Sequence, residues 1–301
     1  MKILLTGATG LIGRELLKQC NEAGISVHYF TTRKAMIEER SNYKGFYWNP
    51  IAQKIDVNAF SGVSAIINLA GANIGKRWTN SYKSEILESR TKPAELMFKT
   101  LKNIDHSITH FISASGVSVY PRSEKNQYTE EDKEVDDTFL AKVVEAWETG
   151  ANQFKSLGMD VSVVRSGMVL AKDGGVFEKL VRPVKFWLGT ALGTGNQWQS
   201  WVHLEDAASI YLYVLTNRLA GVYNAVAPNP VTNKQLNEQI AEQLEAPLWL
   251  PKVPAFFLKL VLGDMAILAL EGQFVSSRKL ELTGYVFKYP TIELACADLL
   301  S

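Results

Sequence analysis

A glycine triplet near the N-terminus, Gly7-x-x-Gly10-x-x-Gly13, constrains the fold of this chain more than any other feature. An apolar, strand-like run ends just before it, and a helical pattern from Leu11 to Cys20 follows it. In such a unit the first glycine permits a tight turn, the second lets the backbone approach a pyrophosphate, and the third lets the helix pack closely on the sheet. The unpaired N–H groups and the dipole of the helix N-terminus favour an anion at the same place. The triplet therefore predicts a phosphate cradle, with an ordinary strand-to-helix turn as the alternative.

The context of the triplet favours a dinucleotide site. The strand-like run Ile3-Leu4-Leu5 precedes the glycines, and a second run, Ser26 to Phe30, follows the helix at the spacing of a βαβ unit. In such a unit the turn between the first strand and the helix holds the pyrophosphate of a dinucleotide. The residues of this turn that we expect to contact the cofactor are Gly7, Thr9, Gly10, Leu11, Ile12 and Gly13.

The end of the second strand indicates which dinucleotide binds. An acid there would accept hydrogen bonds from the ribose of NAD and repel the additional phosphate of NADP. The strand leads instead into Thr31-Thr32-Arg33-Lys34, which contains no acid. Hydroxyl groups and cations bind a 2′-phosphate, and Arg33 can do so through two parallel hydrogen bonds. We therefore expect NADP or NADPH at Thr32, Arg33 and Lys34 and regard NAD as less favoured, with a solvated basic turn as the alternative interpretation.

The composition is that of a globular protein with an extensive core. The chain has 301 residues, 47% of them hydrophobic, which is enough for one large core and a smaller lobe. The net charge is +1 and no basic block is present, so we expect neither nucleic acid nor a membrane as a partner. Cys20 and Cys296 match no metal or redox spacing, and no metal site is predicted. Because the first strand begins at residue 2, we expect no targeting peptide and a cytoplasmic protein.

Strand-like and helical patterns alternate through the first two-thirds of the chain. The strand-like runs are 64–70, 110–114 and 160–165, and helical patterns cover 83–103 and 137–157. This alternation is typical of a parallel, doubly wound sheet. The predicted fold class is therefore α/β, with a Rossmann-type doubly wound parallel sheet and a smaller C-terminal lobe on the substrate side.

The pattern changes near residue 171, where glycines and tryptophans mark a loop-rich region. We expect an NAD(P)-binding Rossmann domain over 1–170, to which segments near 201–227 return. The remaining residues, 171–301, are predicted to form mainly the substrate-side lobe, including a C-terminal domain at 251–298. This lobe should close over the carboxyl ends of the strands, where open α/β sheets bind their ligands.

Several segments resemble those of the extended short-chain dehydrogenase/reductases, and within them the nucleoside-diphosphate-sugar epimerase-like proteins. These segments are Thr6–Gly13, Asn68–Gly71, Ser113–Tyr120, Trp201–Asp206 and Gly221–Asn224. Narrower motifs resemble an atypical branch known as the epimerase family proteins, which carry a C-terminal domain of unknown function. These motifs include Arg77–Thr79, Ser89–Arg90, Trp147–Glu148 and Gln197–Trp201. The resemblance implies a nicotinamide dinucleotide cofactor and adds Leu69, Ala70 and Gly71 to the residues expected to contact it.

The resemblance does not supply a reaction, because the catalytic residues of the wider group are missing. Those enzymes use a tyrosine as acid or base and a lysine four residues later, whose charge favours the phenolate. In this chain Phe139 or Leu140 falls at the tyrosine position, and Val143 or Val144 falls at the lysine position. The serine or threonine that completes the set corresponds to Gly116.

Other side chains near these positions are candidates for the chemistry. Tyr120 follows the fifth strand and is the candidate proton-transfer group, with a residue that only lines the sheet edge as the alternative. Ser115 is the first candidate to replace the missing hydroxyl, and Ser118, which also lies near Gly116, could partly replace it as well. Arg165 ends the sixth strand, where a cation can meet a phosphate or carboxylate, and we expect it to bind the cofactor, with a structural ion pair as the alternative.

Two functions fit this sequence. The first is an NADP-dependent oxidoreductase or epimerase-like enzyme that acts on a small polar or nucleotide-linked substrate. The second is a catalytically inactive protein that senses NADP(H) or binds a partner. The missing tyrosine and lysine favour the second function, and the polar region between the lobes favours the first. A polar pocket against the nicotinamide would indicate an enzyme, whereas packed side chains there would indicate a sensor.

Overall fold

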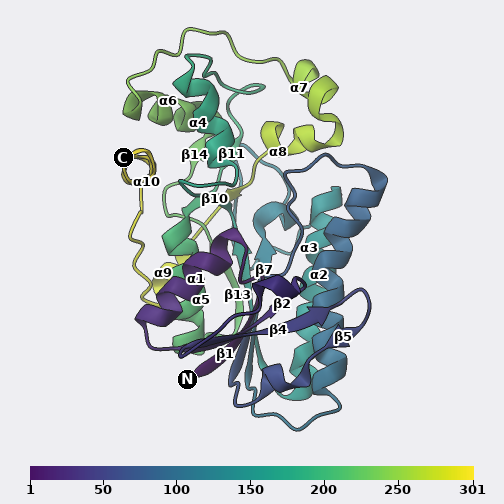
Figure 1. Cartoon of the computed structure of the whole chain (residues 1–301). Coiled ribbons are helices and arrows are strands. Elements are labelled where there is room, and N and C mark those ends of the chain that lie inside the picture. Colours follow the sequence, from purple (N-terminus) through teal and green to yellow (C-terminus); the bar gives the residue numbers. More distant parts are fainter.

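The computed structural model describes all residues, 1–301, as one large sheet between two layers of helices, with a smaller lobe beyond the carboxyl ends of the strands (Figure 1). The strands of the large sheet are β1 (Lys2–Thr6), β2 (Ser26–Thr31), β3 (Glu39–Arg40), β4 (Tyr43–Asn49), β5 (Lys54–Ile55), β6 (Ala65–Asn68), β7 (His110–Gly116), β9 (Asp160–Ser166) and β13 (Gly221–Ala225). Short strands elsewhere are β8 (Gln127–Tyr128), β10 (Met168–Leu170), β11 (Trp198–Gln199), β12 (Trp201–His203), β14 (Val231–Thr232) and β15 (Phe274–Val275). The helices are α1 (Leu11–Glu22), α2 (Asn80–Leu101), α3 (Phe139–Asn152), α4 (Phe177–Lys185), α5 (Leu204–Thr216), α6 (Asn233–Gln243), α7 (Ala255–Leu262), α8 (Ile267–Leu270), α9 (Arg278–Leu282) and α10 (Ile292–Leu300). None of these helices combines the length and the apolar character that a membrane crossing requires.

The order of strands in the large sheet is β13-β9-β7-β6-β1-β2-β4-β3, with β5 paired to β4. The pairs from β13 to β4 are parallel, and only β3 and β5 run antiparallel to their neighbour. The chain builds outward from β1 through β2 and β4 and then returns to build the other half from β6. This topology confirms the predicted doubly wound, Rossmann-type sheet. Its point of reversal lies between β1 and β6, where open α/β sheets bind ligands at the carboxyl ends of the strands.

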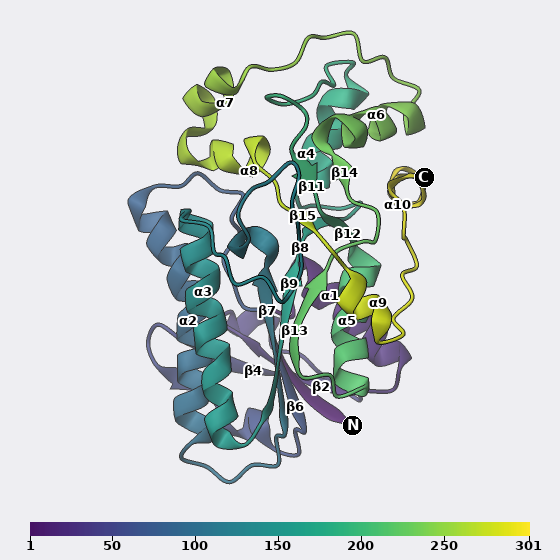
Figure 2. The ribbon, with the colours of Figure 1, turned by 180° about the vertical axis from the view of Figure 1, so that it is seen from behind.

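Two apolar clusters hold the helices on the sheet, one on each face. On one face Leu16 of α1 and Tyr211 of α5 are fully buried against the sheet. On the other face Met97 of α2 packs with Phe154, which follows α3. Figures 1 and 2 show α1 and α5 on the first face and α2 and α3 on the second. A third cluster joins α4, α6 and α10 and forms the core of the smaller lobe.

Helix α4 and strand β4 were not predicted from the sequence. Helix α4 occupies part of the region that we predicted to be rich in loops, and β4 forms an inner strand of the sheet. In α4 the buried residues Phe177, Val181 and Val184 have helical spacing, but Pro183 and the nearby glycines conceal it. In β4 only Phe46 and Trp48 alternate clearly, because the rest of the strand is polar or glycine.

Residues 278–289 return to the large sheet before α10 completes the core of the smaller lobe. Figure 2 shows α9 beside α5 and β13. The carboxylate of Asp206 in α5 is 2% exposed and accepts hydrogen bonds from the backbone N–H groups of Lys288 and Tyr289, each at 2.9 Å. The hydroxyl of Tyr285 donates to the same carboxylate at 3.1 Å. Residues near the C-terminus therefore complete the surroundings of a helix that covers the sheet.

Candidate functional site

The turn between β1 and α1 has the geometry of a phosphate cradle. Gly7 has a φ of +69°, a conformation that favours glycine, and its carbonyl accepts a hydrogen bond from the N–H of Gly10 at 2.9 Å. A Cβ at Gly7 would lie 2.6 Å from the carbonyl oxygen of Leu69, and a Cβ at Gly13 would lie 2.2 Å from the carbonyl oxygen of Gly7. No side chain caps α1, so the N–H groups of its first turn remain available to a ligand. The residues present therefore fit a dinucleotide pyrophosphate.

The second wall of this crevice is the end of β6. The hydroxyl of Thr6 donates to Oδ1 of the fully buried Asn68 at 2.7 Å and accepts from the N–H of Ala70 at 3.0 Å. These bonds join the carboxyl ends of β1 and β6 and fix the path of Leu69, Ala70 and Gly71. The structure thus brings these three predicted residues beside the glycine turn.

Residues of α2 hold the loop that follows Gly71. The hydroxyl of Ser89 accepts from the N–H of Ala72 at 2.8 Å, and Nη2 of Arg90 donates to the carbonyl of Ala72 at 3.3 Å. The Arg90 guanidinium also lies 5.0 Å from the ring centroid of Trp147. Burial lowers the pKa of Arg90 to about 10, and its hydrogen bonds are to backbone carbonyls. Ser89 and Arg90 are therefore positioning residues for this side of the crevice.

Arg33, the first basic residue after β2, lies next to the glycine turn. Nη2 of Arg33 donates to the hydroxyl of Thr9 at 3.2 Å, which ties the end of β2 to the cradle. Nζ of Lys34 lies 5.3 Å from the ring centroid of Tyr47 in β4. Thr32 is exposed beside them. The structure therefore brings Arg33 to Thr9 of the glycine turn, whereas the side chain of Lys34 lies over β4, on the other side of β2.

A buried polar network lies at the carboxyl ends of β7, β9 and β13. Nε and Nη2 of Arg165 donate to the two carboxylate oxygens of Glu148 in α3 at 2.7 and 2.8 Å. Ser115 donates to Oε1 of the same carboxylate at 2.7 Å. The hydroxyl of Tyr120 donates to Oδ1 of Asn224 at 2.9 Å and accepts from Nη1 of Arg165 at 2.8 Å.

This network gives Arg165 and Tyr120 surroundings that differ from those we expected. Burial alone would lower the pKa of the Arg165 guanidinium, but hydrogen bonds and charge from Glu148 raise it above its ordinary value. Arg165 thus forms the structural ion pair that was the alternative interpretation. Tyr120 is 0% exposed, and burial raises the pKa of its phenol despite the opposing effect of Arg165. Its hydroxyl is enclosed by protein and does not reach the cavity described below.

Replacing Tyr120 by phenylalanine is expected to lower the free energy of unfolding by about 1–3 kcal/mol, because Nη1 of Arg165 and Oδ1 of Asn224 lose a buried partner. The change is measured by urea denaturation at neutral pH. The dissociation constant of NADPH should stay unchanged. A variant of unaltered stability that loses turnover would instead assign Tyr120 a direct part in the reaction.

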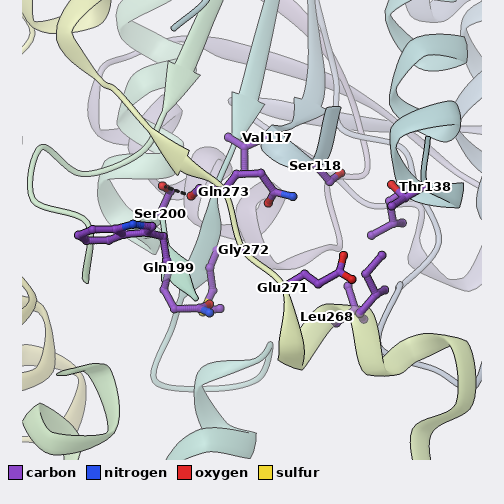
Figure 3. A pocket seen from close by; sticks show the side chains of 13 residues that line it. Val117, Ser118, Thr138, Gln199, Ser200, Leu268, Glu271, Gly272 and Gln273 are labelled. Carbon is purple, nitrogen blue, oxygen red and sulfur yellow. Dashed lines mark hydrogen bonds between the residues drawn. The ribbon is translucent and has the colours of Figure 1, made fainter. Parts of the chain in front are cut away.

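A cavity opens beside this network, between the large sheet and the C-terminal segment (Figure 3). Ser118, which follows β7, and Thr138, the N-cap of α3, line it from the sheet side. Glu271 and Leu268 line it from the C-terminal segment. The remaining lining residues are Val117, Leu140, Met168, Trp198, Gln199, Ser200, Ile267, Gly272 and Gln273.

Ser118, and not Ser115, faces this cavity. A Cβ at Gly116, the position of the missing catalytic serine, would lie 3.6 Å from the Ser118 hydroxyl oxygen and 3.7 Å from a methyl group of Val144. The Ser118 hydroxyl therefore lies close to the place that the family's catalytic hydroxyl would occupy. Ser115 is buried and bonded to Glu148. The structure therefore places Ser118 at the cavity and holds Ser115, the first candidate, in the buried network.

Several contacts cross from the sheet domain to the smaller lobe around the cavity. Nζ of Lys83 in α2 pairs with Oδ2 of Asp264 at 2.5 Å, and Arg122 pairs with Glu271. Lys83 is therefore held by an acid of the lobe. Within the lobe, the Ser200 hydroxyl donates to the carbonyl of Gln273 at 2.7 Å, as Figure 3 shows.

Comparison with known proteins identifies the class of this molecule. Residues 3–226 match the model of the NAD dependent epimerase/dehydratase family, and residues 253–299 match a domain of unknown function, DUF1731. The chain belongs to the NAD dependent epimerase/dehydratase family, as the glycine turn and the crevice at the reversal point also indicate. The predicted resemblance to this family and to its epimerase family protein branch is confirmed.

Among its relatives are two bacterial proteins called epimerase family proteins. SSP1921 of Staphylococcus saprophyticus is 35% identical over 299 residues, which cover 98% of this chain and 98% of the relative. YfhF of Bacillus subtilis is 33% identical over 302 residues, covering 100% and 98%. Among solved structures, the human epimerase family protein SDR39U1 with NADPH is 28% identical, with a TM-score of 0.85 and 99% coverage of both chains. A nucleoside-diphosphate sugar epimerase from Corynebacterium glutamicum is 28% identical, with a TM-score of 0.80, over 100% of this chain and 58% of that chain.

Proposed function

We propose that this protein is an NADP(H)-dependent oxidoreductase or epimerase-like enzyme whose small polar substrate binds in the cavity between the large sheet and the C-terminal segment. The observation that carries the proposal is the cavity itself. Hydroxyl and amide side chains, among them Ser118, Thr138 and Gln199, line it at the carboxyl end of β7. A protein that only sensed the dinucleotide would have no need of a polar pocket at this place.

The choice of NADP(H) rests on the residues at the end of β2. Arg33 is tied to Thr9 of the glycine turn, and Lys34 lies over Tyr47 of β4. Cations at the end of β2 would bind the adenosine 2′-phosphate of NADP, and Thr31-Thr32-Arg33 contains no acid to bind the free ribose of NAD. The relative SDR39U1, whose structure contains NADPH, supports the same choice.

The Arg33→Ala variant is expected to bind NADPH more weakly by roughly 1.5–3 kcal/mol, the usual contribution of a hydrogen bond to a charged group, while its affinity for NADH stays the same. Titration calorimetry with both cofactors measures the difference. Lys102→Ala, which removes an exposed cation at the far end of α2, serves as the control. Equal affinities of the unmodified protein for NADPH and NADH would overturn the assignment.

Different residues would have different roles in the reaction at the cavity. A bound nicotinamide would supply or accept a hydride there. Ser118 would hold a carbonyl or hydroxyl oxygen of the substrate by a hydrogen bond and connect it to solvent for the proton. Leu140 and Val144, at the positions of the missing tyrosine and lysine, would exclude water from this side.

Replacing Ser118 by alanine is expected to reduce turnover about ten- to a hundredfold, or roughly 1.4–2.7 kcal/mol, because the substrate oxygen loses its hydrogen-bond partner. Turnover is followed through NADPH absorbance in a screen of carbonyl compounds. Ser123→Ala, on a loop outside the cavity, is the matched control. Full activity in the Ser118 variant would remove this role.

A second candidate is a catalytically inactive NADP(H) sensor. The observation that favours it is the apolar character of Leu140, Val143 and Val144 where the family has its acid–base pair. In that case NADPH would bind and raise the thermal stability of the protein, while no carbonyl compound or alcohol would change its redox state. A single substrate that is turned over in a Ser118-dependent way excludes this candidate.

A further inference from the structure

We propose that the cavity selects an uncharged polar substrate, such as a free sugar or another hydroxylated carbonyl compound, and rejects nucleoside diphosphates. This inference rests on the proposed function and specifies the substrate class that the same cavity accepts. The proposed substrate differs from the nucleoside-diphosphate sugar that the name of the Corynebacterium glutamicum relative indicates.

The lining of the cavity carries no positive charge. Its 13 residues include no lysine, arginine or histidine, and its only ionisable group is the carboxylate of Glu271. A diphosphate brings about two negative charges and needs cations or free backbone N–H groups to replace its water. In this cavity a diphosphate would instead approach the negatively charged carboxylate of Glu271.

Two cations of the sheet domain pair with acids of the lobe. Arg122 pairs with Glu271 and lies 4.0 Å from Asp136. Lys83 pairs with Asp264 across the opening between the sheet domain and the lobe. A phosphate could recruit either cation only by displacing its carboxylate, which would then face the phosphate without a partner.

The hydrogen-bond donors of Arg165 are also occupied. Glu148 occupies Nε and Nη2 of its guanidinium, Tyr120 occupies Nη1, and its side chain is only 11% exposed. A bound NADP(H) would add its own phosphates at the nearby glycine turn. The field from the cofactor therefore also opposes a second polyanion.

The groups that do line the cavity suit an uncharged ligand with several hydroxyls. The Thr138 oxygen accepts from the N–H of Ala141 at 3.3 Å, so its own hydrogen can be donated to a ligand. Ser118 and Gln199 add a hydroxyl and an amide, which both donate and accept. Trp198 stacks on Phe274 with a centroid distance of 4.3 Å and provides an apolar surface for the carbon face of a sugar ring.

The test compares probes of both classes on the NADPH-loaded protein by saturation-transfer NMR, which detects weak binding without any turnover. The uncharged probes are glucose, xylose and dihydroxyacetone, and the anionic probes are UDP and UDP-glucose. We expect saturation transfer to the uncharged probes and none to the anionic ones. The Leu268→Lys variant adds a cation to the cavity wall and should gain saturation transfer to UDP-glucose, which the unmodified protein should lack.

A matched control and a second variant separate charge from folding effects. Leu260→Lys makes the same substitution on α7, where Leu260 is 78% exposed and outside the cavity, and should not bind UDP-glucose. Glu271→Gln removes the acid and releases Arg122, and it should gain UDP-glucose binding as Leu268→Lys does.

Two results would overturn the inference. One is binding of UDP or UDP-glucose to the unmodified protein as tightly as the best uncharged probe. The other is the absence of binding by every probe. Failure of the proposed function is a different result, because a protein that binds the sugars but never oxidises NADPH with any carbonyl compound would keep the selectivity and lose the enzymatic activity.

Discussion

Replacing Gly10 by valine is expected to weaken NADP(H) binding by about three orders of magnitude or more, roughly 4 kcal/mol, while the protein stays folded. A Cβ at Gly10 would lie 3.1 Å from the carbonyl oxygen of Gly7, a contact that a small shift relieves. The two methyl groups of valine would then occupy the space in front of the α1 N-terminus, where a pyrophosphate meets the free N–H groups. Titration calorimetry measures the binding, and thermal unfolding followed by circular dichroism measures the fold.

Gly13→Ala is the informative comparison. Its Cβ would lie 2.2 Å from the carbonyl oxygen of Gly7 and 2.9 Å from the Cα of Ala8, and both contacts are with backbone that cannot rotate away. We therefore expect Gly13→Ala to lose stability and binding together, whereas Gly10→Val loses binding alone. Normal cofactor affinity in Gly10→Val would show that the turn has only a structural role.

Removing the carboxylate of Glu148 is expected to lower the free energy of unfolding by about 3–5 kcal/mol. Glu148 and Arg165 are 15% and 11% exposed, so the Glu148→Ala variant leaves a guanidinium buried without a counter-charge. Ser115 loses its hydrogen-bond acceptor in the same variant. Urea denaturation measures the loss, and an unchanged denaturant slope verifies that two-state unfolding is retained.

Two controls define the origin of this loss. Glu148→Gln keeps the size of the side chain but not its charge, and it should fall between the unmodified protein and Glu148→Ala. Glu95→Ala breaks ion pairs with Lys92 and Lys99 on the exposed side of α2 and should cost less than about 1 kcal/mol. If Glu148→Ala cost no more than Glu95→Ala, Arg165 would be free to bind a ligand.

The N-terminal βαβ unit could be predicted from the sequence because its determinants are local. The glycine spacing, the apolar strand and the helical periodicity lie within about thirty residues, and β1, α1 and β2 have nearly the expected bounds. Helix α4 could not be predicted in this way. Its apolar residues face α6 and α10, which come much later in the chain, and Pro183 within it is typical of a break.

The candidate site was predictable only where backbone geometry defines it. The residues of the glycine turn could be identified because the motif itself requires their conformation. The role of Tyr120 depends on Asn224, 104 residues away, and on Arg165, and no local pattern reports such contacts. Strand alternation offered a partial signal for the serines, since Ser115 pairs with Arg165 in the register of β7 and β9 and points into the network.

The hydrogen bonds around Asp206 have a consequence for the order in which the protein is made. Lys288 follows Asp206 by 82 residues, and at about 5–20 residues per second a ribosome needs roughly 4–16 s to add them. Until then, the backbone N–H groups that donate to the Asp206 carboxylate of α5 have not been synthesised. The large sheet can assemble early, but its covering layer becomes complete only after residues 288 and 289 have been added. A chain that stops before residue 288 would therefore contain every strand of the large sheet and still lack a finished surface for it.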